Sequence, residues 1–226
     1  MAKNKKQQVK DEPIALDVQL NKGEAFIEKN WKKIAAVLGV VIVVVAGVYL
    51  YKHHMADQEL EAQGAIASAQ TAFAQQQYEQ ALNGDGNNKG FLKIIDEFGG
   101  TKTANLAKLY AGLAYAKTDK VDEAIKMLED FSAEDDDMVS PAAIAALGNL
   151  YVKKGDNEKG LKTLLKAADE ANNDAVSPVF LLQAGEVYES MGQNDKAVEL
   201  YEKIKKQYFR SPLSQEMDKY IERAKK

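Results

Sequence analysis

One short pattern occurs three times along the chain and restricts its fold more than any other feature. An apolar residue, a glycine, two further residues and a tyrosine fill positions 111–115, 147–151 and 184–188, with glycines 36 and 37 residues apart. Helix formers dominate beyond residue 52, and no run of alternating β-branched residues predicts a strand. We therefore expect stacked helix pairs, because a single pair cannot bury its own apolar face.

Each repeated residue has a physical reason for its position. The glycine and a later small residue fit where two antiparallel helices cross closely, and a later large residue fills the space between the helices. Glycine also suits a helix C-terminus where the chain reverses. Ser-Pro pairs predict helix starts, with serine as the cap and proline in the first turn. The turn residues are Asp119, Gly155 and Gly192, the small residues Ala124, Gly160 and Ala197, the large residues Leu128, Leu164 and Tyr201, and the Ser-Pro pairs 140–141, 177–178 and 211–212.

This period and pattern resemble the tetratricopeptide repeat, a helix–turn–helix unit of about 34 residues. The resemblance implies an all-α solenoid whose helix pairs present a surface for binding other proteins. The chain departs from the family pattern in three ways. Its unit is two or three residues longer, the tryptophan expected four residues before each glycine is absent, and Gly160 replaces an alanine.

The repeat spacing also predicts boundaries within a domain over residues 52–226. A long helical stretch is expected from Met55 to Leu82, ended by the polar loop Asn83–Gly90, with the second helix of the first pair over residues 90–104. The predicted units are a divergent repeat over about 56–104, clear repeats over 105–140, 141–177 and 178–211, and a C-terminal capping helix over 212–226.

An uncharged apolar stretch precedes this domain. Residues 34–51 contain no charge, and as a helix they would be roughly 27 Å long. Trp31 lies just before the stretch and Tyr51 ends it, as interfacial aromatics do at the two sides of a bilayer. A buried core helix is the alternative, but such helices seldom run this far without a polar residue. The stretch is therefore predicted to be a transmembrane helix.

Charge indicates how that helix would be oriented. Residues 1–33 carry eight lysines and a net charge of +3, whereas residues 52–226 carry a net charge of −7. No small-residue cleavage site follows the apolar stretch, which favours an uncleaved signal anchor. The positive-inside rule then predicts a cytoplasmic basic segment over 1–33 and a periplasmic domain, in a bacterial inner (plasma) membrane. Small residues at Ala35, Gly39 and Gly47 share one face, where two spans could pack closely, either in a homo-oligomer or against another membrane protein.

The complete layout resembles one family in particular, the bacterial ancillary subunit of the Sec translocon. The likeness is closest over Thr103–Ala111 and Asp122–Ile125, within a lysine-rich head, one span, a long Ala/Gln-rich helix and degenerate repeats. The resemblance implies a membrane-anchored periplasmic scaffold that associates with the translocon and with periplasmic chaperones.

Catalytic chemistry is not expected. The chain has no cysteine, and its two histidines, His53 and His54, are neighbours that point about 100° apart on a helix, so they would chelate a metal poorly. Phosphate-loop, dinucleotide, nucleophile-elbow and zinc-protease motifs are absent from the sequence. We therefore expect no enzyme, no cofactor and no metal site, and the −7 charge disfavours nucleic-acid binding.

Two acidic or amide-rich loops could be mistaken for ion sites. The loop Asn83–Gly90 partly matches a calcium loop, but Lys89 and Lys93 occupy positions that need oxygen ligands. The acidic run Glu134–Asp137 is expected to be a solvated loop between two repeats.

The resemblance to tetratricopeptide arrays also implies a concave groove lined by the first helices of successive units. An apolar groove there would suit an extended or amphipathic peptide segment. Residues 55–82 or 213–226 could instead cover it, and the sequence leaves the two alternatives open. Asn149 and Lys153 alone do not rebuild the carboxylate clamp of some such domains. Carried over by repeat position, the groove residues are Leu106, Leu109, Leu113, Ala116, Lys117, Ala142, Ala145, Asn149, Val152, Lys153, Val179, Leu182, Glu186, Glu189 and Ser190.

Three functions therefore compete. The first is a scaffold that recruits membrane-complex subunits, chaperones or client segments to the Sec translocon. The second is a self-associating structural protein. The third is an accessory factor for cell-envelope assembly, of peptidoglycan or of the outer membrane.

Overall fold

A computed structural model describes the backbone of residues 15–226 and the side chains of residues 24–226. The predicted basic segment thus lies partly outside the described residues. Throughout the described part of the chain, regular structure is helical, apart from one isolated bridge between Gly84 and Lys89. The chain divides after His54 into two compact units, and each is considered by itself.

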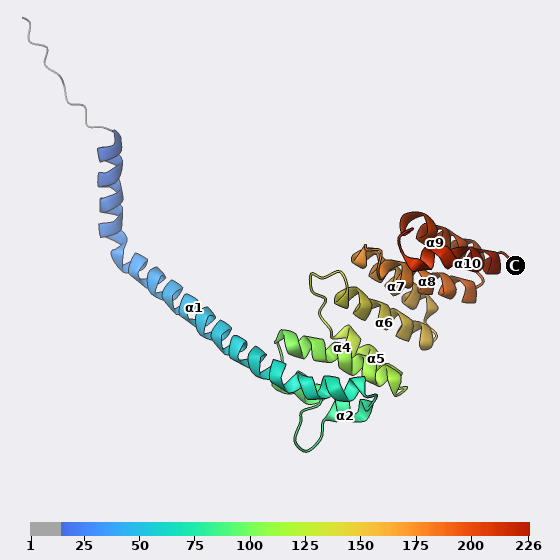
Figure 1. Cartoon of the computed structure of the whole chain (residues 1–226). Helices are drawn as coiled ribbons and strands as arrows, with labels where there is room; N and C mark the ends of the chain where they lie inside the picture. Colours follow the sequence, from blue (N-terminus) through green and yellow to red (C-terminus); the bar gives the residue numbers. More distant parts are fainter. Residues whose placement is uncertain (1–14) are drawn as a thin grey trace, which may run out of the picture. The chain divides into compact units, whose positions relative to one another are not determined.

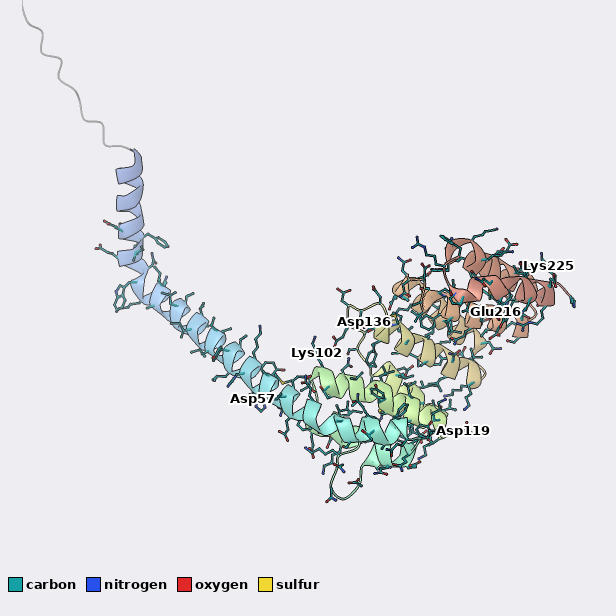
Figure 2. The ribbon with its side chains drawn as sticks, viewed as in Figure 1. Asp57, Lys102, Asp119, Asp136, Glu216 and Lys225 are labelled. Atoms are coloured by element: carbon teal, nitrogen blue, oxygen red, sulfur yellow. The ribbon has the colours of Figure 1, made fainter. Side chains whose placement is uncertain are left out.

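The first unit is dominated by α1 (Ala15–Ala74), which continues into the second unit. Within the described residues, the helical stretch Glu24–Ala74 is long and apolar enough, by length and composition, to cross a membrane. Large apolar side chains between Val37 and Tyr51 are 50–71% exposed, on every side of the helix (Figure 2). The side chains of the apolar stretch are therefore not packed in a core formed by the described residues.

The second unit is a row of helix pairs that pack in chain order (Figure 1). The last part of α1 pairs with two short helices, three regular pairs follow, and a 3₁₀ turn with a final helix ends the row. The bounds are α2 (Tyr78–Asn83), α3 (Phe91–Glu97), α4 (Lys102–Lys117), α5 (Val121–Glu129), α6 (Val139–Lys153), α7 (Asn157–Ala171), α8 (Ser177–Ser190), α9 (Asn194–Gln207), η1 (Pro212–Glu216) and α10 (Met217–Ala224).

The three repeated glycines lie where the helices of each regular pair cross. A methyl group added to Gly112 would approach Leu128 to 2.7 Å, and one added to Gly148 would approach Leu164 to 2.9 Å. At Gly185 the same addition would lie 2.3 Å from the ring of Tyr201. The close crossings predicted from the sequence are thus confirmed, because real carbon atoms do not approach this closely.

Between the first and second helices of each pair, the chain reverses through a residue with positive φ, at Gln76, Asp119, Gly155 and Gly192. The sequence predicted the last three and missed the first. The helix predicted to run to Leu82 therefore ends at Ala74, and α2 is a separate helix within its predicted range. A helix does form within the range 90–104, but it is shorter than predicted, because α3 ends at Glu97 and α4 already begins at Lys102. The second half of the first pair thus consists of α2 and α3 on either side of the loop Gly84–Gly90, whose tight chain crossing leaves no room for a side chain at Gly84.

Of the three Ser-Pro serines, Ser211 occupies the predicted N-cap position before η1, whereas the other two have a different role. Ser140 and Ser177 lie inside the first turns of α6 and α8, and neither caps its helix. Ser177 Oγ instead donates to the carbonyl of Ala168 (2.9 Å) and accepts from the N–H of Asn173 (3.0 Å). The serines thus tie the preceding loop to the helix start.

The two segments that could have covered a groove are both parts of the row. Ala62, Ile66, Ala69 and Ala72 of α1 are buried in one core cluster with residues of α3 and α4. At the other end, α10 packs against α9 and buries Met217. Residues 55–74 therefore act as the first helix of the first pair, and α10 closes the last core.

Candidate protein-binding site

A cavity of about 490 Å³ lies where the N-terminal halves of α4 and α6 meet the last part of α1. It thus contacts the first helices of three successive pairs, together with the loop that joins α5 to α6. Its lining residues are Glu59, Gln63, Ile66, Lys102, Thr103, Asn105, Leu106, Phe131, Glu134, Asp136, Val139 and Ser140.

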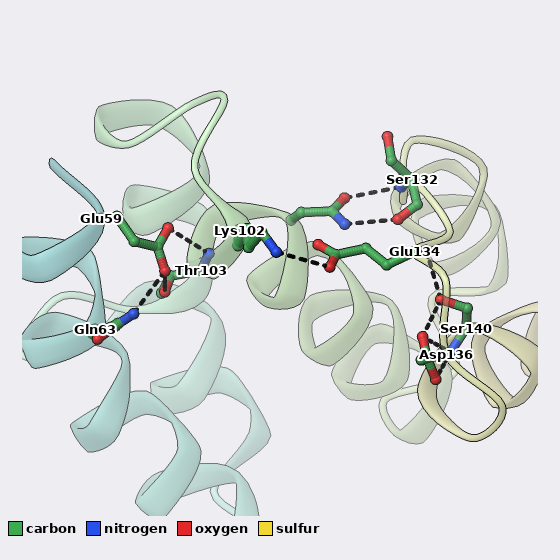
Figure 3. A network of polar contacts seen from close by, with 9 residues as sticks. Glu59, Gln63, Lys102, Thr103, Ser132, Glu134, Asp136 and Ser140 are labelled. Atoms are coloured by element: carbon green, nitrogen blue, oxygen red, sulfur yellow. Dashed lines mark hydrogen bonds and ion pairs between the residues drawn. The ribbon is translucent and has the colours of Figure 1, made fainter. Parts of the chain in front are cut away.

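Glu59 fixes the wall that α1 contributes. Its carboxylate accepts hydrogen bonds from Thr103 Oγ1 (2.8 Å), the Thr103 N–H (3.2 Å) and Gln63 Nε2 (2.9 Å), as Figure 3 shows. Thr103 lies in the first turn of α4, and Thr101 caps that helix by accepting from the N–H of Ala104 (3.0 Å). Partial burial raises the pKa of the Glu59 carboxyl, but the hydrogen bonds outweigh it and the pKa lies below its ordinary value. Glu59 therefore stays ionised at the positive end of α4.

The loop that forms the opposite wall is held to α4 by several polar contacts (Figure 3). Asn105 exchanges two hydrogen bonds with the backbone of Ser132, at 2.7 and 2.9 Å. Lys108 Nζ donates to the carbonyl of Asp130 (2.9 Å), and Lys102 pairs with Glu134 across 3.5 Å. The loop is therefore positioned by the protein itself before any partner arrives.

Asp136 anchors the other end of this loop. Its carboxylate accepts from the N–H groups of Met138 (2.9 Å) and Ser140 (3.1 Å), and from Ser140 Oγ (2.6 Å). Burial raises the pKa of the Asp136 carboxyl, but these bonds outweigh it and the pKa lies below its ordinary value. Within the acidic run that was expected to be solvated, Asp136 is thus a helix cap for α6.

The rest of the site is apolar and acidic. Ile66, Leu106 and Phe131 supply an apolar wall, and Val139 remains 45% exposed at its edge. Beside them, the carboxylates of Asp135 and Asp137 make no hydrogen bond or ion pair with any residue that the structure describes. The arrangement holds no nucleophile paired with a base, but it can accommodate apolar side chains beside negative charge.

The residues predicted to line a groove have three different environments. Leu109 and Ala145 are only 8% and 2% exposed, so they belong to the core and cannot line an accessible surface. The apolar residues Leu106, Leu113, Ala116, Val152, Val179 and Leu182 are half-buried against their neighbours. Lys117, Ala142, Asn149, Lys153, Glu186 and Ser190 are exposed, and Glu189 is half-buried. Of the residues predicted to line a groove, Leu106 is the one that also lines the cavity.

Polar groove residues of the last two pairs are engaged within the protein. Asn149 Nδ2 donates to Gln183 Oε1 (3.1 Å), and Lys153 pairs with Asp119 of the preceding turn. On α8, Glu189 binds Arg223 at 2.7 Å. These side chains tie neighbouring repeats together, whereas the carboxylates of Asp135 and Asp137, next to the cavity-lining Asp136, have no partner among the described residues.

Sequence reasoning missed the part of the site on α1, because the first repeat was not in register. A signal was present: Ala69, Gln76 and Ala81 are spaced like Gly112, Asp119 and Ala124. That spacing places Gln63 and Ile66 at the positions of Leu106 and Leu109. The first repeat was overlooked because its turn has no glycine and Ala72 stands where the others have tyrosine.

The repeat geometry agrees with a family comparison. The model of the tetratricopeptide repeat-like domain matches residues 24–214. The chain belongs to the tetratricopeptide repeat-like domain family. Domains of this family are generally non-catalytic modules for protein–protein interaction. The cavity is therefore a candidate site for binding another protein. A search of curated proteins returns no match to this tetratricopeptide repeat-like chain.

Solved structures show the same repeat-like fold at low sequence identity. The nearly identical TPR-like repeats of a candidate kinesin light chain from Podosopora anserina match with a TM-score of 0.59 and 14% identity, covering 74% of this chain and 86% of that one. A structure of MamA protein matches with a TM-score of 0.52 and 20% identity, covering 75% of this chain and 91% of that one. At these identities the likeness concerns the fold alone.

Proposed function

We propose that the protein is a membrane-anchored scaffold, held in a bacterial inner membrane by residues 34–51 and presenting its repeats to the periplasm. One observation carries this proposal, the exposure of large apolar side chains around the whole helix between Val37 and Tyr51. In water such a continuous apolar surface would need a partner or would aggregate. In a bilayer it needs neither, because the helix satisfies its own backbone hydrogen bonds.

The direction of insertion rests on charge. Eight lysines precede the apolar stretch and only Lys52 follows it closely, which supports a cytoplasmic N-terminus under the positive-inside rule. With the repeats in the periplasm, the cavity would face secreted chains and their chaperones. We propose recruitment of such partners to the Sec translocon as the specific role.

Anchoring can be tested by placing charge in the apolar stretch. The double substitution Val41→Lys and Val44→Lys adds about 2.5–3.5 kcal/mol of insertion cost per charge. It should release the protein from membranes washed with alkaline carbonate. Leu60→Lys, an exposed position of α1 beyond the stretch, is the matched control and should stay membrane-bound. Carbonate extraction of the unsubstituted chain would contradict anchoring.

Orientation has a separate test, because the chain contains no cysteine. Asn4→Cys and Asp174→Cys introduce single thiols before and after the apolar stretch. A membrane-impermeant maleimide applied to cells with a permeabilised outer membrane should label the Asp174→Cys variant, and the Asn4→Cys variant only after lysis. The reverse pattern would place the repeats in the cytoplasm.

Partner identity can be tested by photocrosslinking from the cavity. Benzoylphenylalanine at Leu106, with Lys162 on the exposed side of α7 as control, should yield adducts with translocon subunits, chaperones or secreted chains at Leu106 alone. Leu109 is unsuitable because it is buried. Adducts of the chain with itself would instead favour the self-associating alternative. Adducts with peptidoglycan or outer-membrane assembly factors would favour the accessory role.

A further inference from the structure

We infer that the cavity between α1, α4 and α6 binds a partner segment that combines large apolar side chains with lysine or arginine. This inference rests on the proposed scaffold function and names the chemistry of the partner. It joins two features of the same region, an apolar cavity and unpaired carboxylates on the two residues next to its lining residue Asp136.

The apolar part sets the first requirement. The volume of about 490 Å³ lies within the range of roughly 300–1,000 Å³ that ligand pockets occupy. Ile66, Leu106, Phe131 and Val139 come from three helices and a loop, so one inserted side chain would touch four separate walls. A segment bearing one or two large apolar residues would remove these surfaces from water together.

Charge sets the second requirement. The carboxylates of Asp135 and Asp137 have no partner among the described residues, and both residues flank Asp136, which lines the cavity. Within the described residues, the Glu134 carboxylate pairs with Lys102 alone, whose side chain is 81% exposed, and such surface pairs exchange easily. A cation next to the inserted apolar residue could therefore pair with Asp135, Asp137 or Glu134 without breaking the caps made by Glu59 and Asp136.

A partner of different sequence fits these features better than a second copy of the chain. Residues 52–226 carry a net charge of −7, so two such domains repel each other overall. The second unit does expose a basic aromatic element, Phe209 with Arg210 over its ring at 5.6 Å. Self-association through this element is therefore the competing outcome.

The test uses the full chain in detergent micelles and three fluorescein-labelled peptides. The probe is Gly-Ser-Lys-Leu-Lys-Phe-Ser-Gly, one analogue replaces both lysines by glutamate, and the other replaces leucine and phenylalanine by serine. Fluorescence anisotropy should show binding of the probe that is about tenfold tighter than binding of either analogue. Affinity for the probe should also fall with added salt.

Two pairs of variants locate the binding. Val139→Ser should weaken the probe about tenfold, whereas Met138→Ser should not, because Met138 is equally exposed (50%) but does not line the cavity. The double variant Asp135→Asn and Asp137→Asn should weaken the probe and flatten its salt dependence. Asp174→Asn with Glu158→Gln removes the same charge from exposed positions elsewhere and should change neither.

Several results would overturn the inference. One is equal binding of the probe and its glutamate analogue. Another is an equal effect of Val139→Ser and Met138→Ser on binding of the probe. A third is that the probe does not bind at all. A dimer in detergent that Phe209→Ser and Val139→Ser both dissociate would make a second copy the occupant. Adducts from Leu106 with acidic partner segments would reject the charge requirement while leaving the scaffold function intact.

Discussion

The first helix pair and the three later pairs solve the same packing problem with different residues. Each later pair places a glycine against a large residue of its second helix, and Gly185 against Tyr201 is the tightest of these crossings. The first pair has Ala69 at that position, and its second helix is broken into α2 and α3. The apolar space that Leu128 fills in the next pair is filled by Phe91 and Ile94 from beyond the inserted loop.

The polar side chains of the two regions also have different roles. In the later pairs, polar residues predicted for the groove, such as Asn149 and Lys153, make contacts between repeats. At the junction of the first and second pairs, Glu59 and the loop after α5 hold a cavity open instead. The regular repeats are therefore tied to one another, and the irregular pair with its neighbouring loop forms the candidate site.

The largest effect is expected where a later pair is tightest. Gly185→Ala inserts a methyl group against the fully buried ring of Tyr201, and overpacking of this kind costs about 2–3 kcal/mol. Gly64→Ala is the matched control, because nothing lies within 4 Å of an added methyl group there, and alanine should stabilise α1 by about 0.5–1 kcal/mol. Chemical denaturation of the full chain in detergent measures both. Equal and small effects would show that the crossing tolerates a side chain.

The second effect concerns the site. Glu59→Ala removes the carboxylate that holds Thr103 at the start of α4, and the loss of such a cap costs about 1–2 kcal/mol. Glu61→Ala, two residues away and 3.7 Å from Lys89 at its closest, should produce no measurable change. The same denaturation experiment compares them. If the two variants were alike, Glu59 would not organise the cavity.

The two regions also differ in how far the sequence reveals them. The later pairs were predictable because Gly112, Gly148 and Gly185 recur with their large partners. Only glycine fits at such a close helix crossing, so the crossing can be recognised from the residue type. The first pair was harder to predict, because Gln76 adopts a positive φ and glutamine, unlike glycine, does not indicate such a turn in a sequence. Alanine at 69 and 81 fits a close crossing but is too common in helices to identify one.

The site was harder to predict than the fold. Of four consecutive acids, Asp136 alone caps α6, and that choice depends on the path of the loop rather than on residue type. Leu109 and Ala145 were assigned to the groove from repeat position, but contact with neighbouring helices buries them. Position within a repeat thus indicates which helix faces the groove, whereas exposure depends on how closely adjacent pairs stack.

Acid should affect both regions through carboxylates with lowered pKa values. Partial burial of Glu59 and Glu189 is outweighed by hydrogen bonds from Thr103 and Gln63 in one case, and from Arg223 and Tyr201 in the other. Each therefore contributes stability above the unfolded pKa of about 4.3, and this contribution is lost as the pH falls through the lower folded value. Stability measured from pH 6 to pH 3 should decline, and Glu59→Gln and Glu189→Gln should each flatten the decline. An unchanged slope in both variants would contradict the linkage.

The smallest effect tests the irregular turn directly. Gln76 has a φ of 63°, and a residue other than glycine in this conformation costs about 1 kcal/mol, so Gln76→Gly should stabilise the protein by roughly 0.5–1 kcal/mol. Gly155→Gln makes the reverse change at an equivalent turn, where φ is 93°, and should destabilise by a similar or larger amount. Thermal unfolding of both variants in detergent provides the measurement. A loss of stability in Gln76→Gly would mean that this side chain supports the turn, and that the first pair uses its own stabilising contacts rather than a strained version of the shared design.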